Sequence, residues 1–198
     1  IEILPPDINA SLANFSVDHG AIRFGLAAVR NIGEAAIADI TAVRQEKGPF
    51  RSLSDFCSRV DLGKVNKRAT ESLIKCGAFD SLHVRRSQLL AVLDSAVGEA
   101  QRRQRDAMNG QMGLFSDEIM DVSADLQMPD LEEAPQSELL NWEKETTGFY
   151  ITGHPLDQYK EKLKNLPDLT ELTADHIRNR QTVRIGGILS DTKRITTK

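Results

Sequence analysis

The chain has 198 residues, of which 40% are hydrophobic and 27% are charged, and its formal net charge is −4. This size and composition are typical of one or two modest globular domains. The sequence excludes a membrane helix, which needs about 20 consecutive apolar residues, and it excludes a signal peptide over residues 1–20. We therefore expect a cytoplasmic protein with no membrane partner. The chain begins at Ile1 without a methionine and stops at Lys198 within a strand-like run, so we expect a piece of a longer protein.

The first 24 residues predict an extended segment followed by a short β-hairpin. Pro5 and Pro6 favour extended backbone. Residues 15–17 and 21–24 are two strand-like runs that turn at His19-Gly20.

Residues 24–40 predict two short helices joined at Asn31-Ile32-Gly33. Apolar residues recur at helical spacing, and the small residues between them allow two helices to approach closely. Gly33 permits a positive φ at the turn. The second helix should run from Glu34 to about Glu46, because Gly48-Pro49 cannot continue it.

This pattern is typical of a helix-hairpin-helix element. It leaves the amides of residues 32–34 unpaired at a helix N-terminus, where they and the helix dipole favour a phosphate oxygen. Arg30 would lie close by. The alternative is a helical hairpin whose glycine serves packing only. The residues that we assign to DNA binding in this turn are Arg30, Asn31, Ile32, Gly33 and Glu34.

A second, degenerate helical hairpin follows. A helix should run from Ser52 through Val60, and Asn66 should cap a helix over residues 67–75 that stops at Gly77. The turn between them, residues 61–65, lacks the Ile-Gly pattern.

Three basic residues of the second hairpin could also contact phosphates. They are Lys64, Lys67 and Arg68, which fall at the turn and at the start of its second helix. A solvated charged face is the alternative explanation.

Charge is segregated along the chain. From Arg23 to Arg105, 15 Lys and Arg accompany 9 Asp and Glu, whereas from Ser116 to Glu145 one lysine accompanies ten acids. The basic part could follow a row of phosphates, and the acidic part is too poor in large apolar residues to fold alone. We therefore predict a linker over residues 116–136 whose role is spacing.

The remaining elements complete a mainly α fold. A long helix should end at Asn109-Gly110, which closes a tandem helix-hairpin-helix domain over residues 25–110. Ser137 should cap the first helix of a helical connector over residues 137–180. Residues 182–188 alternate as a half-buried strand and residues 192–197 follow as its neighbour, so residues 181–198 predict the first strands of a truncated β-barrel.

The cysteines and histidines show no metal-ligand spacing. Cys57 and Cys76 lie among helical apolar positions, and the four histidines are scattered. We expect buried, reduced thiols, and neither a metal site nor a cofactor in this chain.

Six short blocks resemble, in order and spacing, the C-terminal half of the alpha subunit of bacterial DNA polymerase III. They are Leu4–Asn9, Ile22–Leu26, Gly48–Phe50, Val65–Arg68, Gly77–Asp80 and Gly148–Tyr150 with Gly153–Leu156. In that family this region holds a tandem helix-hairpin-helix domain on duplex DNA, followed by a clamp-binding peptide and an OB fold. The resemblance implies that residues 181–198 begin the OB fold, and that the partners are double-stranded DNA, the sliding clamp and other holoenzyme subunits.

The pentapeptide Gln111-Met112-Gly113-Leu114-Phe115 resembles the sliding-clamp motif of the same family. Its glutamine amide can form hydrogen bonds while Leu114 and Phe115 fill an apolar pocket. The alternative is that both apolar residues fold back onto the preceding helix.

The resemblance implies a parent DNA-directed DNA polymerase whose catalytic carboxylates, which hold two Mg²⁺ ions, lie upstream of Ile1. We expect no catalytic residue here, and a module that binds duplex DNA without sequence preference, docks on the clamp and supports processive synthesis. Two other classes stay open. One is a helix-hairpin-helix DNA repair enzyme, for which Asp39 and Lys47 are the nearest catalytic candidates, and the other is a helical interaction module that does not bind DNA.

Overall fold

The computed structural model describes residues 1–108, 127–164, 166, 182, 184–189 and 192–195. It divides into two units, Ile1–Thr152 and Gly153–Lys198. The predicted clamp-binding peptide and the first half of the predicted linker lie outside the described residues.

The N-terminal residues form a three-stranded sheet in the order β1-β3-β2. Strands β2 (Ser16–Asp18) and β3 (Ala21–Arg23) pair antiparallel, which confirms the predicted hairpin. Its turn places His19 at φ 49° and Gly20 at φ 86°. Strand β1 (Ile3–Leu4) adds to the free edge of β3 in parallel, with Ile3 opposite Ile22.

The first of the two predicted short helices is a single 3₁₀ turn, η1 (Leu26–Ala28). The amides of Leu26 and Ala27 donate to the carbonyls of Leu12 and Ala13, both at 2.9 Å. The amide of Arg30, which would donate to the carbonyl of Leu26 in an α-helix, donates instead to the carbonyl of Thr146 at 2.7 Å, so the turn does not continue as an α-helix. The second helix is confirmed as α1 (Glu34–Lys47), which ends at Gly48 with φ 78°.

The second hairpin is present with both predicted caps. Helix α2 (Leu53–Arg59) begins where the Ser52 side chain accepts from the amide of Asp55, and α3 (Lys67–Lys75) begins where the Asn66 side chain accepts from the amide of Ala69. These caps satisfy amides that the first turn of a helix leaves without a partner.

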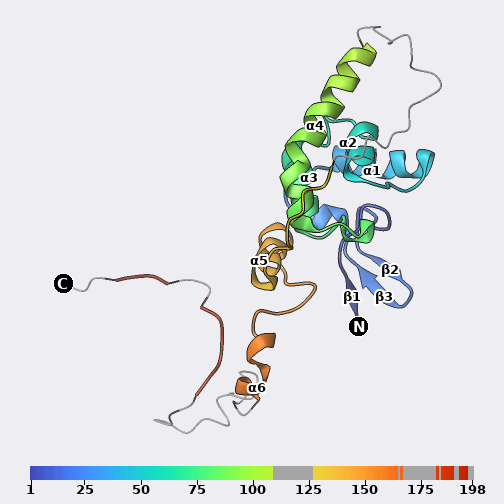
Figure 1. Ribbon diagram of the computed structural model, residues 1–198. Helices are drawn as coiled ribbons and strands as arrows, with labels where there is room; N and C mark the ends of the chain where they lie inside the picture. The colour runs from blue at the N-terminus through green and yellow to red at the C-terminus, as the bar shows by residue number, and fades with distance from the viewer. Residues whose placement is uncertain (109–126, 165, 167–181, 183, 190–191, 196–198) are drawn as a thin grey trace. The chain divides into compact units, whose positions relative to one another are not determined.

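Helix α4 (Arg86–Met108) packs along α2 and α3 and its last turns continue past them (Figure 1). A row of edge-to-face aromatic rings lies beneath it, with centroids 4.9 Å apart for Phe50 and Phe56 and 5.1 Å apart for Phe56 and Phe79. Cys57 and Cys76 are buried and free, as predicted, and burial raises the pKa of each thiol to about 12.

The described end of the predicted linker is bound to the start of α4, so it is more than a solvated spacer. The Glu133 carboxylate accepts from the amides of Arg86 at 2.8 Å and Ser87 at 3.0 Å, and the Gln88 side chain donates to the carbonyl of Pro129 at 2.7 Å. Partial burial alone would raise the pKa of Glu133, but backbone hydrogen bonds outweigh it and lower the pKa. A carboxylate at this position also complements the helix dipole.

Helix α5 (Gln136–Thr147) begins one residue before the predicted cap. The carbonyl of Pro135 accepts from the amides of Glu138 and Leu139, and no side chain caps the helix, so the assignment of Ser137 as its cap is wrong. Proline fixes the φ that a helix start requires, which places the boundary ahead of the serine.

A buried ionic network joins α4 to α5. The Arg86 guanidinium is 3.2 Å from Glu143 and 2.6 Å from Asp80, which lies in the 3₁₀ turn η2 (Asp80–Leu82). Glu143 is 0% exposed and also accepts from the amides of Ile151 and Thr152, both at 3.0 Å. Burial alone would lower the pKa of Arg86, but the two carboxylates outweigh it and raise the pKa.

In the second unit, η3 (Asp157–Tyr159) and α6 (Lys160–Leu163) follow a turn in which the amide of His154 donates to Asp157. Described residues 182, 184–189 and 192–195 contain no strand, so the predicted strand over 182–188 is not formed in them. A strand needs a hydrogen-bonded partner, and these residues supply none to one another. The OB fold stays a prediction. None of the described helices is long and apolar enough to span a bilayer.

We expect Glu143→Ala to lower the free energy of unfolding by about 3 kcal/mol, because it leaves the buried Arg86 with one partner fewer. Urea unfolding followed by circular dichroism measures the change. Glu145→Ala, two residues away on an exposed position, is the control and should change it by less than about 0.5 kcal/mol. Equal midpoints for the two variants would contradict the structural role of Glu143.

Candidate nucleic-acid interface

The turn of the first hairpin uses Asn31, not Gly33, for its left-handed residue. Asn31 has φ 66°, whereas Gly33 is the N-cap of α1 with φ −87° and ψ 162°. The prediction that Gly33 supplies a positive φ is therefore wrong. Asparagine tolerates the left-handed region better than most residues, which explains how the chain turns without glycine there.

The start of α1 leaves backbone donors open, as the sequence predicted. Among the hydrogen bonds of the described residues, none uses the amides of Ile32, Gly33 or Glu34, and no side chain caps the helix. The carbonyl of Gly33 accepts from Ala36 and Ile37, so the helix is well formed directly behind these amides. Open amides at a helix N-terminus favour an anion.

Two neighbouring helices hold this turn in place. The amide of Arg30 donates to the carbonyl of Thr146 in α5 at 2.7 Å, and the Asn31 side chain donates to the hydroxyl of Ser72 in α3 at 3.0 Å. Hydrogen bonds from the amide before Asn31 and from the Asn31 side chain thus hold its left-handed backbone in place.

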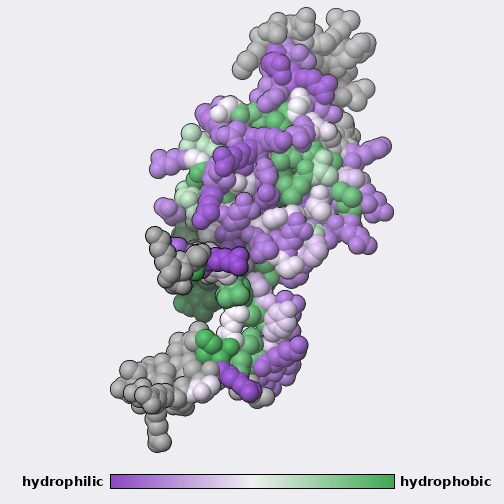
Figure 2. Space-filling model, turned by 90° about the vertical axis from the view of Figure 1, so that its left-hand side faces the viewer, coloured by the Kyte–Doolittle hydropathy of each residue, from purple (hydrophilic) through white to green (hydrophobic). Residues whose placement is uncertain are grey.

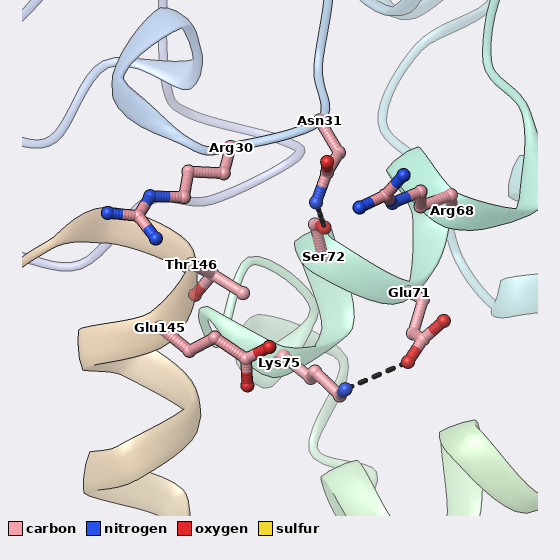
Figure 3. Close-up of a pocket in the computed structure, with 8 residues that line it drawn as sticks. All are labelled: Arg30, Asn31, Arg68, Glu71, Ser72, Lys75, Glu145 and Thr146. Atoms are coloured by element: carbon pink, nitrogen blue, oxygen red, sulfur yellow. Dashed lines mark hydrogen bonds and ion pairs between the residues drawn. The ribbon is translucent and has the colours of Figure 1, made fainter.

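A cavity of about 210 Å³ lies where the turn meets α3 and α5 (Figure 3). Lys75 is paired with Glu71 at 2.8 Å. Arg30 and Arg68 are exposed, and neither side chain has an ion-pair partner among the described residues. In Figure 3 the Arg68 side chain extends toward Asn31, whereas Arg30 extends across the end of α5. The lining residues are Arg30, Asn31, Arg68, Glu71, Ser72, Lys75, Glu145 and Thr146.

The lysines of the second hairpin are engaged elsewhere. Lys64 lies 3.2 Å from Asp61 and 3.5 Å from Asp39, and Lys67 is paired with Asp94 on α4. Hydrogen bonding to Asp61 raises the pKa of Lys64, and hydrogen bonds from Gly63 and Lys64 lower the pKa of Asp61.

The amides of residues 63–65 in the second turn are satisfied within the chain, whereas those of Asn66 and Lys67 at the start of α3 have no hydrogen-bond partner among the described residues. Those of Gly63, Lys64 and Val65 all donate to oxygens of Asp61, at 2.9, 2.9 and 2.8 Å. Of the three basic residues predicted in this hairpin, the structure therefore places only Arg68 beside the first turn. The Asp61-x-Gly63 spacing is typical of an Asx turn, so the sequence contained a signal that the Asp61 side chain would bind an amide of this turn.

Sequence reasoning missed five residues that line the cavity, which are Glu71, Ser72, Lys75, Glu145 and Thr146. Lys75 lies seven residues after Arg68, so the two occupy the same face of α3, and this spacing could have been noticed. Ser72 and Thr146 accept hydrogen bonds from Asn31 and Arg30 of the turn, and no local sequence pattern predicts these contacts.

The described residues offer little to a catalytic or metal site. They contain no group of three or more His, Cys, Asp and Glu residues suited to a metal ion. Asp39, a candidate for a repair enzyme, accepts from the amide of Asp61 at 2.8 Å. Lys47 lies at the far end of α1 from the turn, about 20 Å along the helix at 1.5 Å per residue. Asp39 and Lys47 therefore do not lie together in one site beside the first turn.

Residues 1–89 match the family model described as a helix-hairpin-helix motif, so the first unit contains a helix-hairpin-helix domain. The whole chain aligns with part of the DNA polymerase III subunit alpha of Vibrio cholerae at 36% identity over 201 residues, and with that of Bacillus subtilis at 39% over 198 residues. In both cases the alignment covers 100% of this chain and 17% of the relative. The subunit of Caulobacter vibrioides is 41% identical over 157 residues, which cover 79% of this chain and 14% of the relative.

The chain thus belongs to the DNA polymerase III alpha subunit family, as a homologue of one segment of that subunit. It spans about a sixth of the length of these relatives, since the alignments cover 17% of them.

We expect Gly33→Ala to leave the free energy of unfolding within about 0.5 kcal/mol of wild type, because a Cβ there meets no atom within 4 Å and the backbone is ordinary. Gly25→Ala is the contrasting variant. Its Cβ would lie 2.5 Å from the carbonyl carbon of Asn14, and it should cost about 2 kcal/mol. Thermal or urea unfolding tests both, and a severe loss for Gly33→Ala would show that Gly33 is needed for packing.

Proposed function

We propose that this chain is a duplex-DNA-binding module of a replicative DNA polymerase, and that it holds the phosphate backbone without reading base sequence. The observation that carries the proposal is the first turn. Open amides of residues 32–34 lie next to two exposed, unpaired arginines, Arg30 and Arg68. Amides and guanidinium groups are the usual phosphate ligands in DNA-binding proteins, and such contacts position a protein without carrying sequence information.

The two hairpins have unequal roles in this proposal. The first presents open donors beside cations that have no ion pair among the described residues, whereas the second uses the amides of residues 63–65 on Asp61 and its lysines on Asp39, Asp61 and Asp94. A phosphate at the second turn would have to displace an ion pair and approach a carboxylate. The second hairpin therefore serves mainly to place Arg68 beside the first.

The environment of Gly33 supports close approach by a ligand. Its φ does not require glycine, and a side chain would meet empty space. The reason that remains for the smallest residue lies outside the protein, because a Cβ would stand between a phosphate and the open amides.

The relatives suggest the wider setting. They are subunits named alpha, and the chain covers 17% of their length. We propose a parent DNA-directed DNA polymerase whose Mg²⁺-binding carboxylates lie outside this chain, which works with other holoenzyme subunits in the cytoplasm. Within this proposal the module holds duplex DNA while residues 111–115 dock on the sliding clamp, and both contacts support processive synthesis.

The first test is the salt dependence of duplex binding. Contact with about four phosphates gives a slope of log K against log salt near −3.5, and Arg30→Gln/Arg68→Gln should remove about 1.8 units of that slope. Fluorescence anisotropy with duplexes of unrelated sequence measures it. Gly33→Val should weaken binding while the chain stays folded.

Lys64→Gln/Lys67→Gln removes the same charge from the paired lysines and is the matched control, with an expected slope change below about 0.5 units. Binding that is insensitive to salt, strong preference for one base sequence, or equal effects of the two double variants would overturn the proposal. The last outcome would favour a helical interaction module.

The second test addresses clamp docking. The chain should bind a purified bacterial sliding clamp with a Kd in the micromolar range, near −8 kcal/mol. Leu114→Ala/Phe115→Ala should remove about 3 kcal/mol, because short anchors concentrate binding energy in few side chains. Asp117→Ala/Glu118→Ala, a double truncation just outside the pentapeptide, should bind as wild type in calorimetry. Equal clamp affinity for both double variants would refute docking through this peptide.

A further inference from the structure

The last turns of α4 carry three exposed arginines, Arg102, Arg103 and Arg105, which the candidate interface does not include. Arg105 donates to the carbonyl of Gln101 in its own helix at 3.4 Å, and none of the three has an ion pair among the described residues. In Figure 2 hydrophilic side chains gather at the upper end of the molecule, where α4 ends in Figure 1.

The last turns of α4 contact the second hairpin through Gln104. The side chain of Gln104 donates to the carbonyl of Val60 at 2.9 Å, directly before the turn. Farther back along α4, Asp94 pairs with Lys67 and so fixes the start of α3. Helix α4 thus contacts both α3, which carries Arg68, and the residue before the second turn, whose Lys64 is already in an ion pair.

Helical geometry separates the three arginines by direction. At about 100° per residue, Arg105 falls about 20° from the direction of Asp94, and Arg102 about 80° from it, whereas Arg103 points about 180° away. Arg102 and Arg105 therefore continue the side of α4 on which α3 begins. Arg105 lies about 16 Å beyond Asp94 along the helix axis, a distance that corresponds to about five nucleotides of one DNA strand.

We propose that Arg102 and Arg105 form a second phosphate contact on the same duplex, several nucleotides from the first turn. This inference rests on the proposed function and extends it. The second turn places its lysines in ion pairs, and α4 supplies the unpaired positive charge beside it. Two separate groups of arginines, Arg30 with Arg68 and Arg102 with Arg105, suit the repeating negative charge of a DNA strand.

The acidic residues of the chain are the competing occupant. Their described end is bound elsewhere, because Glu133 caps the start of α4 at Arg86, about 24 Å along the helix from Arg102. Duplex DNA is the occupant that the charge of these arginines favours, and the titrations below test it against the chain's own acidic residues.

The test compares Arg105→Gln with Arg103→Gln in duplex-binding titrations of the full 198-residue chain between 50 and 200 mM NaCl. The two variants lose the same charge from the same helix on opposite faces. We expect Arg105→Gln to lower the salt slope by about 0.9 units and Arg103→Gln to leave it unchanged, and Arg102→Gln/Arg105→Gln to lower it by about 1.8 units. For the double variant, the ratio of wild-type to variant affinity should then shrink about 12-fold across this salt range.

Each outcome decides the inference. Identical slopes for Arg105→Gln and Arg103→Gln, with Arg30→Gln/Arg68→Gln still defective, would overturn this contact and leave the proposed function intact. Tighter binding by Arg105→Gln at low salt would also overturn it. Absence of salt-dependent binding in the wild type would overturn both proposals. If Arg105→Gln has a lowered unfolding midpoint, Arg102→Gln asks the same question at the neighbouring position.

Discussion

The buried guanidinium of Arg86 is the contact on which the candidate interface depends. It donates to Glu143 in α5 and to the carbonyl of Lys75 at the end of α3, and so fixes these two helices relative to each other. The same two helices carry Ser72 and Thr146, which hold the first turn. A buried ion pair is costly when incomplete, so its geometry is restricted, and that restriction passes to the turn.

The two hairpins show how one local design can serve different purposes. Both place a turn before a helix, but in the second Asp61 satisfies the turn amides and Asn66 caps the helix, whereas the helix of the first has no side-chain cap. A helix start without a cap is less stable in isolation, by about 1 kcal/mol. The first turn keeps that cost and gains donors that a phosphate can use. The backbones differ as well, since Asn31 is left-handed in the first turn and no residue of the second turn, 61–65, has a positive φ.

Ion pairing, as well as the positions of Lys and Arg in the sequence, determines where net positive charge lies on the surface. The basic part of the chain has 15 Lys and Arg, yet Lys64, Lys67 and Lys75 are neutralised by neighbouring carboxylates. The opposite charges of an ion pair largely cancel at a distance, so exposed arginines without an ion pair among the described residues dominate the field that a polyanion meets. The arginines of the first turn and of α4 are therefore better candidates for phosphate contact than the density of basic residues alone would indicate.

The sequence by itself determined the elements whose signals are local. Caps at Ser52 and Asn66, the turn at His19-Gly20 and the boundaries of α1 and α3 follow from residue types a few positions apart. Tertiary structure decided the rest. The Arg30 amide bonded to Thr146, 116 positions farther along the chain, and left the first helix as a 3₁₀ turn, and Asn31 took the left-handed position assigned to Gly33. These outcomes depend on hydrogen bonds between distant segments, and no periodicity or short motif records which distant group will be the partner.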